Sequence, residues 1–226
     1  MVKTNNLSEN MYDLSTVLDF EALSSVRPGT SLLIAGPAMS GKEALAMDVL
    51  KDGAREGEGA VVVTTNDQAA AIVDEFKTDV PDIEDSQLGV VDCRGDGSDS
   101  QQSGSYIHHV SSPGDLTGIG IGITKALDGL HKSGRDKGRL ALVSLSTMLT
   151  YTDKKTVFKL CHILSSRLDS AGYIGVFTID SGAHDDQTLQ VIKQAFDGLI
   201  EFRETDGLRE ARVMGLSSQP SDWKEL

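Results

Sequence analysis

Short apolar runs alternate with amphipathic helical stripes along most of this chain, and no other feature constrains its fold more. The runs are each the length of a buried strand and cover residues 31–35, 60–65, 88–92, 140–144 and 173–179. Between them, apolar residues recur every three or four positions, as at Ile119, Ile123, Leu127 and Leu130. This alternation predicts an α/β fold in which a mainly parallel twisted sheet is flanked by helices.

The C-terminal part follows a different pattern. A helix is expected to begin at Asp185, and the stretches 198–203 and 210–216 then flank Asp206-Gly207. An Asp-Gly dipeptide between two strand-like stretches favours a tight hairpin turn. We therefore expect an antiparallel hairpin at the edge of the parallel sheet.

A length of 226 residues favours one domain rather than two. We expect a single domain over residues 21–226, preceded by a loosely attached polar arm over residues 1–20. The low-complexity stretch 94–112, RGDGSDSQQSGSYIHHVSS, is predicted to be a mobile insertion in this domain.

Acidic residues dominate the charge of the chain: 34 Asp and Glu against 21 Lys and Arg give a net charge of −13. Such a surface repels phosphate backbones and anionic lipid, so neither a nucleic-acid partner nor a membrane role is expected. No apolar run in the sequence is long enough to span a bilayer. The acidity is typical of a halophilic cytoplasm, and Cys93 and Cys161, which are outside any metal-binding spacing, fit a reducing compartment.

The first predicted strand runs into a glycine-bounded loop that a helical pattern follows. The loop matches the phosphate-binding P-loop G-x-x-x-x-G-K-[ST], in which backbone N–H groups and the lysine contact phosphates and the hydroxyl ligates Mg²⁺. Seven of the eight positions fit, and glutamate stands where Ser or Thr belongs. The predicted site for ATP or ADP consists of Gly36, Pro37, Ala38, Met39, Ser40, Gly41, Lys42 and Glu43.

Glu43 leaves the function of this loop open. A carboxylate ~4 Å from a phosphate oxygen costs about 4 kcal/mol at an effective dielectric constant of 20. That cost shrinks at high salt, and its sign reverses if Mg²⁺ bridges the two anions. Glu43 therefore either weakens nucleotide binding or serves as a direct metal ligand, and a third interpretation is a loop that binds nothing.

The chain resembles the RecA/RadA superfamily, and within it the archaeal KaiC-like proteins. The resemblance extends over roughly residues 21–223, and the P-loop and the run LVSLSTML, which fits the pattern hxxLSxxL with h an apolar residue, are its most specific parts. It implies a RecA-type core, ATP at the P-loop and assembly into rings or filaments. The segments that carry it are 25–50, 61–76, 140–180 and 196–223.

Three departures from this family fall on one reaction. Family members have an Asp that holds the magnesium-bound water where this chain has Val143, and a Glu where this chain has the stretch 65–68. With Glu43 in the hydroxyl position, the groups that fix Mg²⁺ and activate water are all replaced. We therefore predict little or no ATPase activity, no catalytic residue and a doubtful Mg²⁺ site. Asp67 is the one carboxylate left to orient water, although Asn66 or Asp67 is better explained as a helix N-cap.

The preferred interpretation is a non-hydrolysing P-loop protein that acts as a regulatory or scaffolding factor. It would bind ATP or ADP weakly through Lys42 and report occupancy to a protein partner or through self-assembly. One alternative is a slow ATPase that uses Glu43 as metal ligand and Asp67 for the water. The other is an interaction module with an empty nucleotide site.

Several other features are interpreted as structural. The glycines of the segment 118–122, GIGIG, are assigned to close helix packing, and His108-His109 to a solvated loop. Ser146 is not expected to be a nucleophile, because the sequence indicates no histidine beside it. The basic stretch 131–139 is predicted to be a solvated loop, and Trp223 to pack the C-terminal tail onto the core or to contact a neighbouring subunit.

Overall fold

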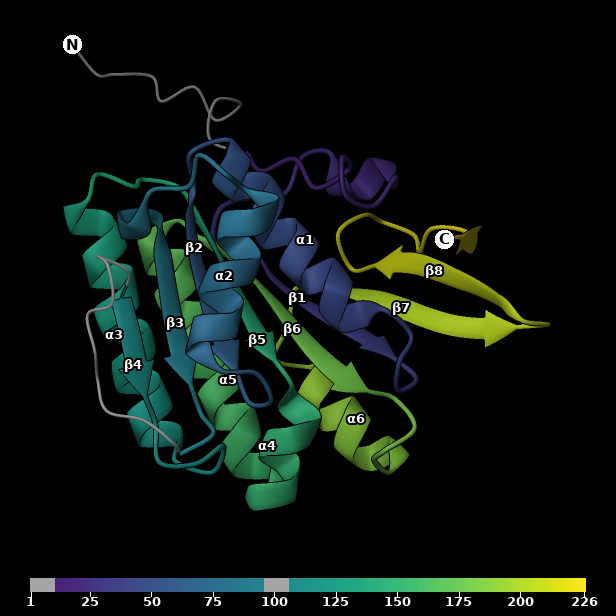
Figure 1. The fold of residues 1–226 in the computed structure, drawn as a ribbon. Helices are drawn as coiled ribbons and strands as arrows, with labels where there is room; N and C mark the ends of the chain where they lie inside the picture. Colours follow the sequence, from purple (N-terminus) through teal and green to yellow (C-terminus); the bar gives the residue numbers. More distant parts are fainter. Residues whose placement is uncertain (1–10, 96–105) are drawn as a thin grey trace, which may run out of the picture.

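The computed structural model describes residues 11–95 and 106–226, which form a nine-stranded sheet flanked by helices (Figure 1). The strand order is β4-β3-β2-β5-β6-β1-β7-β8-β9. The strands are β1 (Ser31–Gly36), β2 (Gly59–Thr64), β3 (Leu88–Asp92), β4 (Tyr106–His109), β5 (Gly138–Val143), β6 (Ile174–Asp180), β7 (Gly198–Thr205), β8 (Leu208–Met214) and β9 (Lys224–Glu225). The helices are α1 (Lys42–Arg55), α2 (Ala69–Asp79), α3 (Leu116–Lys132), α4 (Leu145–Tyr151), α5 (Lys154–Ala171) and α6 (Asp186–Lys193), with 3-10 turns at Glu21–Leu23 and Asp85–Gln87.

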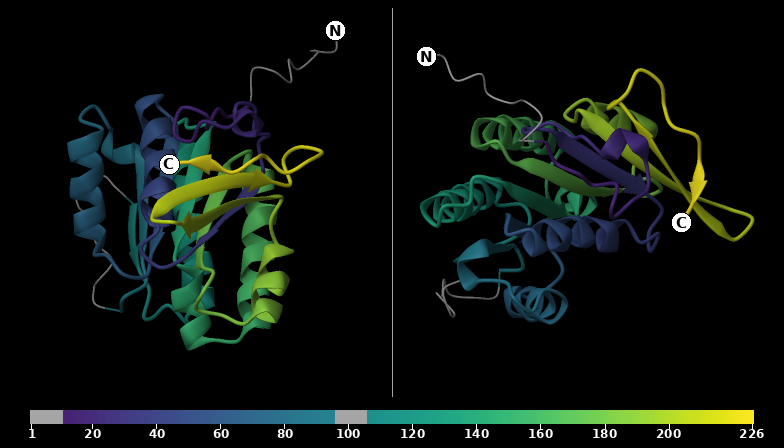
Figure 2. Two further views of the ribbon diagram at one scale, coloured as in Figure 1. Left: turned by 90° about the vertical axis from the view of Figure 1, so that its right-hand side faces the viewer. Right: turned by 90° about the horizontal axis from the view of Figure 1, so that it is seen from above.

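Across the sheet from β4 through β3, β2, β5, β6 and β1 to β7, each strand pairs in parallel with the next. This arrangement confirms the predicted α/β fold. Helices α1 and α2 cover one face of the sheet and α3 to α6 cover the other, as Figure 2 shows. Successive residues of a strand point to opposite faces. Accordingly, Leu32 and Ile34 of β1 belong to the core on the side of α1 and α2, and Leu33 and Ala35 to the core on the side of α3 to α6. Because these strands are buried on both faces, nearly all of their residues are apolar, which explains the continuous apolar runs of the sequence.

The antiparallel hairpin is also confirmed. β7 pairs with β8 in the register Thr205↔Leu208, and the turn residues Asp206 and Gly207 have φ angles of 53° and 80°. Two positive φ values are typical of a type I′ turn, whose twist matches that of the flanking strands. The hairpin projects beyond the helices at one side of the molecule (Figure 1).

The tail after the hairpin folds back onto it. β9 pairs with β8, and the guanidinium carbons of Arg203 and Arg212 lie 3.9 and 4.5 Å from the centroid of the Trp223 ring. Such cation–π contacts fix the indole on the hairpin. Trp223 therefore packs on the edge of the sheet rather than in the main core.

The segment before the first strand is bound more tightly than its polar composition predicts. Tyr12, Leu14 and Phe20 are buried in the core beside α1. The Tyr12 hydroxyl donates to the Gly172 carbonyl and accepts from the Gly138 N–H. The expected loose attachment is wrong for residues 11–20, because a few spaced apolar side chains suffice to anchor it, and residues 1–10 lie outside the described residues.

The expected mobile insertion over 94–112 contains a strand. β4 pairs in parallel with β3, and its His108 ring packs so closely on Gly122 that an added Cβ there would overlap it. This contact confirms close helix packing for Gly122 and corrects the solvated-loop interpretation of His108. Residues 96–105 of the insertion lie outside the described residues.

Both cysteines are expected to be unreactive in the folded protein. Burial raises the pKa of the Cys93 and Cys161 thiols to about 12, so almost no thiolate exists at pH 8. A thiol reagent such as Ellman's reagent should modify neither cysteine at pH 8 until guanidinium chloride unfolds the chain. Rapid modification of the native protein would contradict this burial.

Candidate functional site

The glycine-bounded loop follows β1 at the carboxyl edge of the parallel sheet, where α/β folds bind ligands. Met39 and Gly41 have φ angles of 60° and 92°, and Gly41 precedes the first residue of α1. An added Cβ at Gly36 would lie 2.7 Å from Cβ of Phe202 and 2.8 Å from Oγ of Ser40. Gly36 and Gly41 are therefore required by close packing and by backbone conformation.

Lys42 is buried and its ammonium group is fully engaged. Nζ lies 2.5 Å from Oδ1 of Asp180 and 2.9 Å from Oε1 of Glu43, and it donates to the Pro37 carbonyl at 3.1 Å. Asp180 ends β6 and is in register with Gly36 of the neighbouring β1. The lysine that would contact phosphate in a P-loop thus forms ion pairs with two carboxylates.

Sequence reasoning missed Asp180, because nothing in the local pattern around it indicates a ligand site. Its position follows only from the strand order, which places β6 directly beside β1. A correct prediction that the strand after α5 pairs with the P-loop strand would have identified Asp180 as a neighbour of the loop.

A second cation stands at the rim of the loop. An added Cβ at Gly41 would lie 3.4 Å from Nη1 of Arg209, which belongs to β8 of the hairpin. The N-terminus of the 14-residue helix α1 adds its backbone N–H groups at the same place. The loop therefore keeps a backbone and two cations suited to an anion, although Asp180 and Glu43 compete for Lys42.

Val143 stands where the resemblance to KaiC-like proteins predicts a magnesium-holding carboxylate. Val143 ends β5, is 7% exposed and belongs to the core beside α1. β5, β6 and β1 are adjacent parallel strands in that order, so Val143 lies at the same edge of the sheet as the loop, two strands away from β1. Over residues 11–95 and 106–226, no three His, Cys, Asp or Glu side chains are grouped to hold a metal ion.

The sequence profile of a family of unknown function, DUF7504, matches residues 29–202, which is most of the chain. The chain belongs to the DUF7504 family. Its fold is similar to that of a KaiC-like protein from the hyperthermophilic archaeon Pyrococcus horikoshii OT3, with a TM-score of 0.66 and 15% sequence identity over 96% of this chain and 90% of that one. No curated protein is similar to it in sequence. The structural similarity supports the RecA/KaiC-like fold of this DUF7504 chain.

Asp67 does not have the capping role that the sequence predicts. Helix α2 has Gln68 at its N-cap, without a side-chain cap, and Oδ2 of Asp92 accepts the Ala69 N–H at 3.0 Å. Asp67 is exposed, and its N–H donates to Oγ1 of Thr64. In this DUF7504 chain the carboxylate at the α2 N-terminus comes from the neighbouring strand β3, so the prediction for Asn66 or Asp67 is wrong.

Replacing Asp92 is expected to destabilise the fold more than replacing Asp67. Asp92 is buried and accepts the N–H groups of Ala69 and Arg94, so Asp92→Ala should cost about 1–3 kcal/mol of unfolding free energy. Asp67→Ala should cost less than about 0.5 kcal/mol, because its side chain is on the surface. Urea unfolding followed by circular dichroism measures both values, and equal costs would contradict the assignment of the cap.

Ser146 has a histidine neighbour that the sequence does not indicate. His184 Nε2 lies 2.8 Å from Oγ of Ser146, and the same oxygen accepts the Asp180 N–H at 2.8 Å. Ser146 lies in the first turn of α4 and His184 in the turn between β6 and α6. The DUF7504 chain thus holds Asp180, the partner of Lys42, by a hydrogen bond to Ser146, which links it to the β6–α6 turn.

Proposed function

We propose that this chain is a non-hydrolysing P-loop protein of the cytoplasm that acts as a regulatory or scaffolding factor and binds ATP or ADP weakly. The observation that carries the proposal is the double ion pair of Lys42 with Asp180 and Glu43. A phosphate group must displace at least one carboxylate before the lysine can contact it. Nucleotide binding then competes with an interaction inside the protein, which lowers affinity.

Hydrolysis has little support from the residues at the site. It requires a held Mg²⁺ ion and a positioned water. Val143 offers no oxygen for the metal-bound water, and Glu43 is engaged with Lys42. Loss of a general base alone typically lowers a rate by ~10² to 10⁴.

A weak nucleotide site at this position could still transmit a signal. Displacing Asp180 from Lys42 would disturb its hydrogen bond to Ser146 and the contact of Ser146 with His184. The turn between β6 and α6 would then differ between the free and the bound protein. This coupling is a physical route by which occupancy could control self-assembly or a protein partner.

Two measurements test the proposal. Purified protein in high KCl with Mg²⁺ should show no ATP turnover above that of Lys42→Ala. Millimolar ATP or ADP should raise the melting temperature of the wild type slightly and that of Lys42→Ala not at all, since a ligand stabilises by RT ln(1 + [L]/Kd). Turnover that Lys42→Ala abolishes would refute the proposal, and no shift with any nucleotide would leave an empty-loop interaction module.

A further inference from the structure

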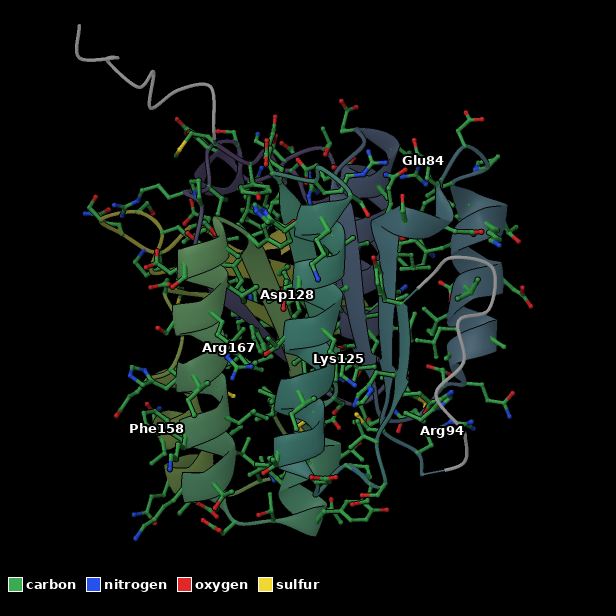
Figure 3. All side chains as sticks on the ribbon, turned by 90° about the vertical axis from the view of Figure 1, so that its left-hand side faces the viewer. Glu84, Arg94, Lys125, Asp128, Phe158 and Arg167 are labelled. Atoms are coloured by element: carbon green, nitrogen blue, oxygen red, sulfur yellow. The ribbon has the colours of Figure 1, made fainter. Side chains whose placement is uncertain are left out.

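A groove of about 490 Å³ lies on the surface between α3 and α5, on the face opposite α1 and α2. Figure 3 shows the two helices side by side on this face, with Lys125 and Arg167 labelled. Ile121 and Ile163 line the groove and are 49% and 39% exposed. Leaving two isoleucines in water is unfavourable by about 1 kcal/mol or more each, so the groove is suited to an apolar occupant.

Small residues of α3 line part of the groove, and an arginine of α5 is hydrogen-bonded to them. Gly120 and Thr124 of α3 line it, and Nη1 of Arg167 from α5 donates to the Gly120 carbonyl at 2.7 Å and to the Thr124 hydroxyl. This bridge holds the two helices in fixed positions. The groove is therefore pre-formed, which lowers the entropic cost of binding a rigid partner.

The charge around the groove is opposite to that of the whole chain. Lys125, Lys159 and Arg167 line it, and none of its lining residues is acidic. Asp128, also labelled in Figure 3, is exposed on α3 but outside the lining. In a protein of net charge −13, three cations and no anion around exposed isoleucines make a site complementary to carboxylates.

The groove is long enough for a short helix. Its α3 side runs from Leu116 to Lys125, which is about 14 Å at 1.5 Å per residue, or two to three helical turns. Apolar side chains at positions i, i+4 and i+7 of a bound helix would extend over about 10 Å of this length.

A second copy of this chain does not provide such a helix from its described residues. Outside the groove, the exposed large apolar side chains are Met39, Tyr151, Leu208 and Leu226. They lie in the P-loop, at the end of α4, in the hairpin and at the last residue, so they form no apolar stripe on a helix. A helix of another protein is therefore the occupant that we consider, and contact between two copies of this groove is an outcome of the test.

We propose that the α3–α5 groove docks an amphipathic helix of a partner protein, with an aliphatic stripe in contact with Ile121 and Ile163 and carboxylates facing Lys125 and Lys159. This surface is separate from the P-loop and does not depend on nucleotide binding.

Selection from a library of displayed helical peptides, with randomised positions on one face, tests the proposal against the folded full chain. The enriched peptides should carry Leu or Ile at i, i+4 and i+7, flanked by Asp or Glu. The double variant Ile121→Asp, Ile163→Asp should bind them about tenfold or more weakly. Leu208→Asp, which changes an exposed leucine of the hairpin in the same way, should bind them as the wild type does.

Charge is tested separately with the double variant Lys125→Glu, Lys159→Glu, which should lose the preference for acidic peptides. Raising KCl should weaken the wild-type complex more than the complex of this variant. No enrichment, enrichment without acidic residues, or binding that survives the isoleucine changes would overturn the proposal. A wild-type dimer that only the isoleucine changes convert to monomer would also overturn it, in favour of contact between copies of the chain.

Discussion

Replacing Glu43 with threonine and Asp180 with asparagine together should raise the affinity for ATP about a hundredfold or more. Each change removes a carboxylate that is bound to Lys42, at 2.9 and 2.5 Å. Removing either carboxylate also removes its repulsion of a bound phosphate, and a unit charge ~4 Å away is worth about 4 kcal/mol at an effective dielectric constant of 20, a value that partial exposure reduces. Isothermal titration calorimetry in the presence of Mg²⁺ measures the gain.

The two single variants separate the roles of the carboxylates. Asp180→Asn should raise affinity with or without Mg²⁺, because it acts on Lys42 alone. Glu43→Thr also restores the hydroxyl that ligates Mg²⁺ in P-loops, so its gain should be larger with the metal. The control is Asp186→Asn, which removes the same charge from an exposed position in the first turn of α6. If Glu43→Thr lowers affinity instead, Glu43 is a metal ligand and the slow-ATPase interpretation gains.

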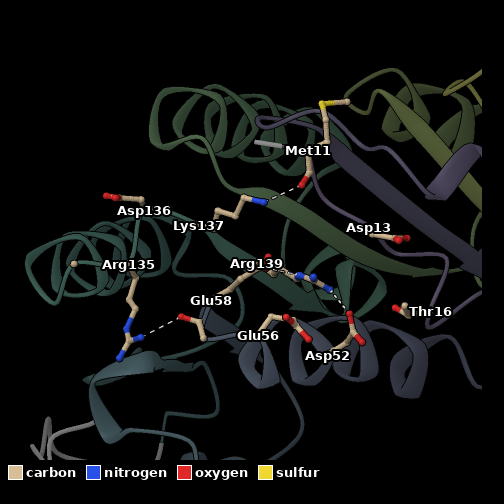
Figure 4. A pocket seen from close by; sticks show the side chains of 12 residues that line it. Met11, Asp13, Thr16, Asp52, Glu56, Glu58, Arg135, Asp136, Lys137 and Arg139 are labelled. Atoms are coloured by element: carbon tan, nitrogen blue, oxygen red, sulfur yellow. Dashed lines mark hydrogen bonds and ion pairs between the residues drawn. The ribbon is translucent and has the colours of Figure 1, made fainter. Parts of the chain in front are cut away.

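The second large effect is expected at Arg139, where Arg139→Met should destabilise the fold by about 3–5 kcal/mol. Arg139 is 3% exposed; its Nε lies 2.7 Å from Glu58 and its Nη1 lies 3.0 Å from Asp52. Nη1 also donates to the Val49 carbonyl of α1. Figure 4 shows the ion pair between Arg139 and Asp52, two residues that line a pocket at the amino edge of the sheet. Removing the guanidinium leaves two carboxylates without their counter-charge.

Lys77→Met is the control for this prediction. Lys77 pairs with Asp85 at 2.9 Å, but both side chains are at least one third exposed, so the loss should be under about 1 kcal/mol. Urea unfolding at one fixed salt concentration compares the two variants. Equal losses would show that the Arg139 cluster contributes no more than a surface ion pair.

Arg139 also shows where the charge pattern of the sequence misleads. The stretch 131–139 reads as a solvated basic loop, but its last residue lies in β5 and is buried. Long basic side chains are normally exposed unless they are paired. The acidic partners Asp52 and Glu58 lie about 80 positions earlier in the chain, so their pairing with Arg139 is invisible before the strand order is known.

Local patterns predicted the elements that depend on neighbouring residues. Buried parallel strands appear as continuous apolar runs, and the turn at Asp206-Gly207 has a chemical signature of its own. β4 escaped prediction because only four residues at an edge pair with β3, within a polar stretch. Asp180 and Asp92 escaped because each acts on an element that is distant in sequence. At the candidate site the loop was predictable, whereas the partners of its lysine depended on tertiary structure.

The clamped indole of Trp223 gives this protein a built-in optical reporter. Trp223 is the single tryptophan of the chain, so the tryptophan emission comes from one place, beside two guanidinium groups of the hairpin. β7 is hydrogen-bonded to the P-loop strand β1, and Arg209 of the hairpin stands beside Gly41. A change in the hairpin that moves Arg203 or Arg212 relative to the indole would therefore change the emission without any label.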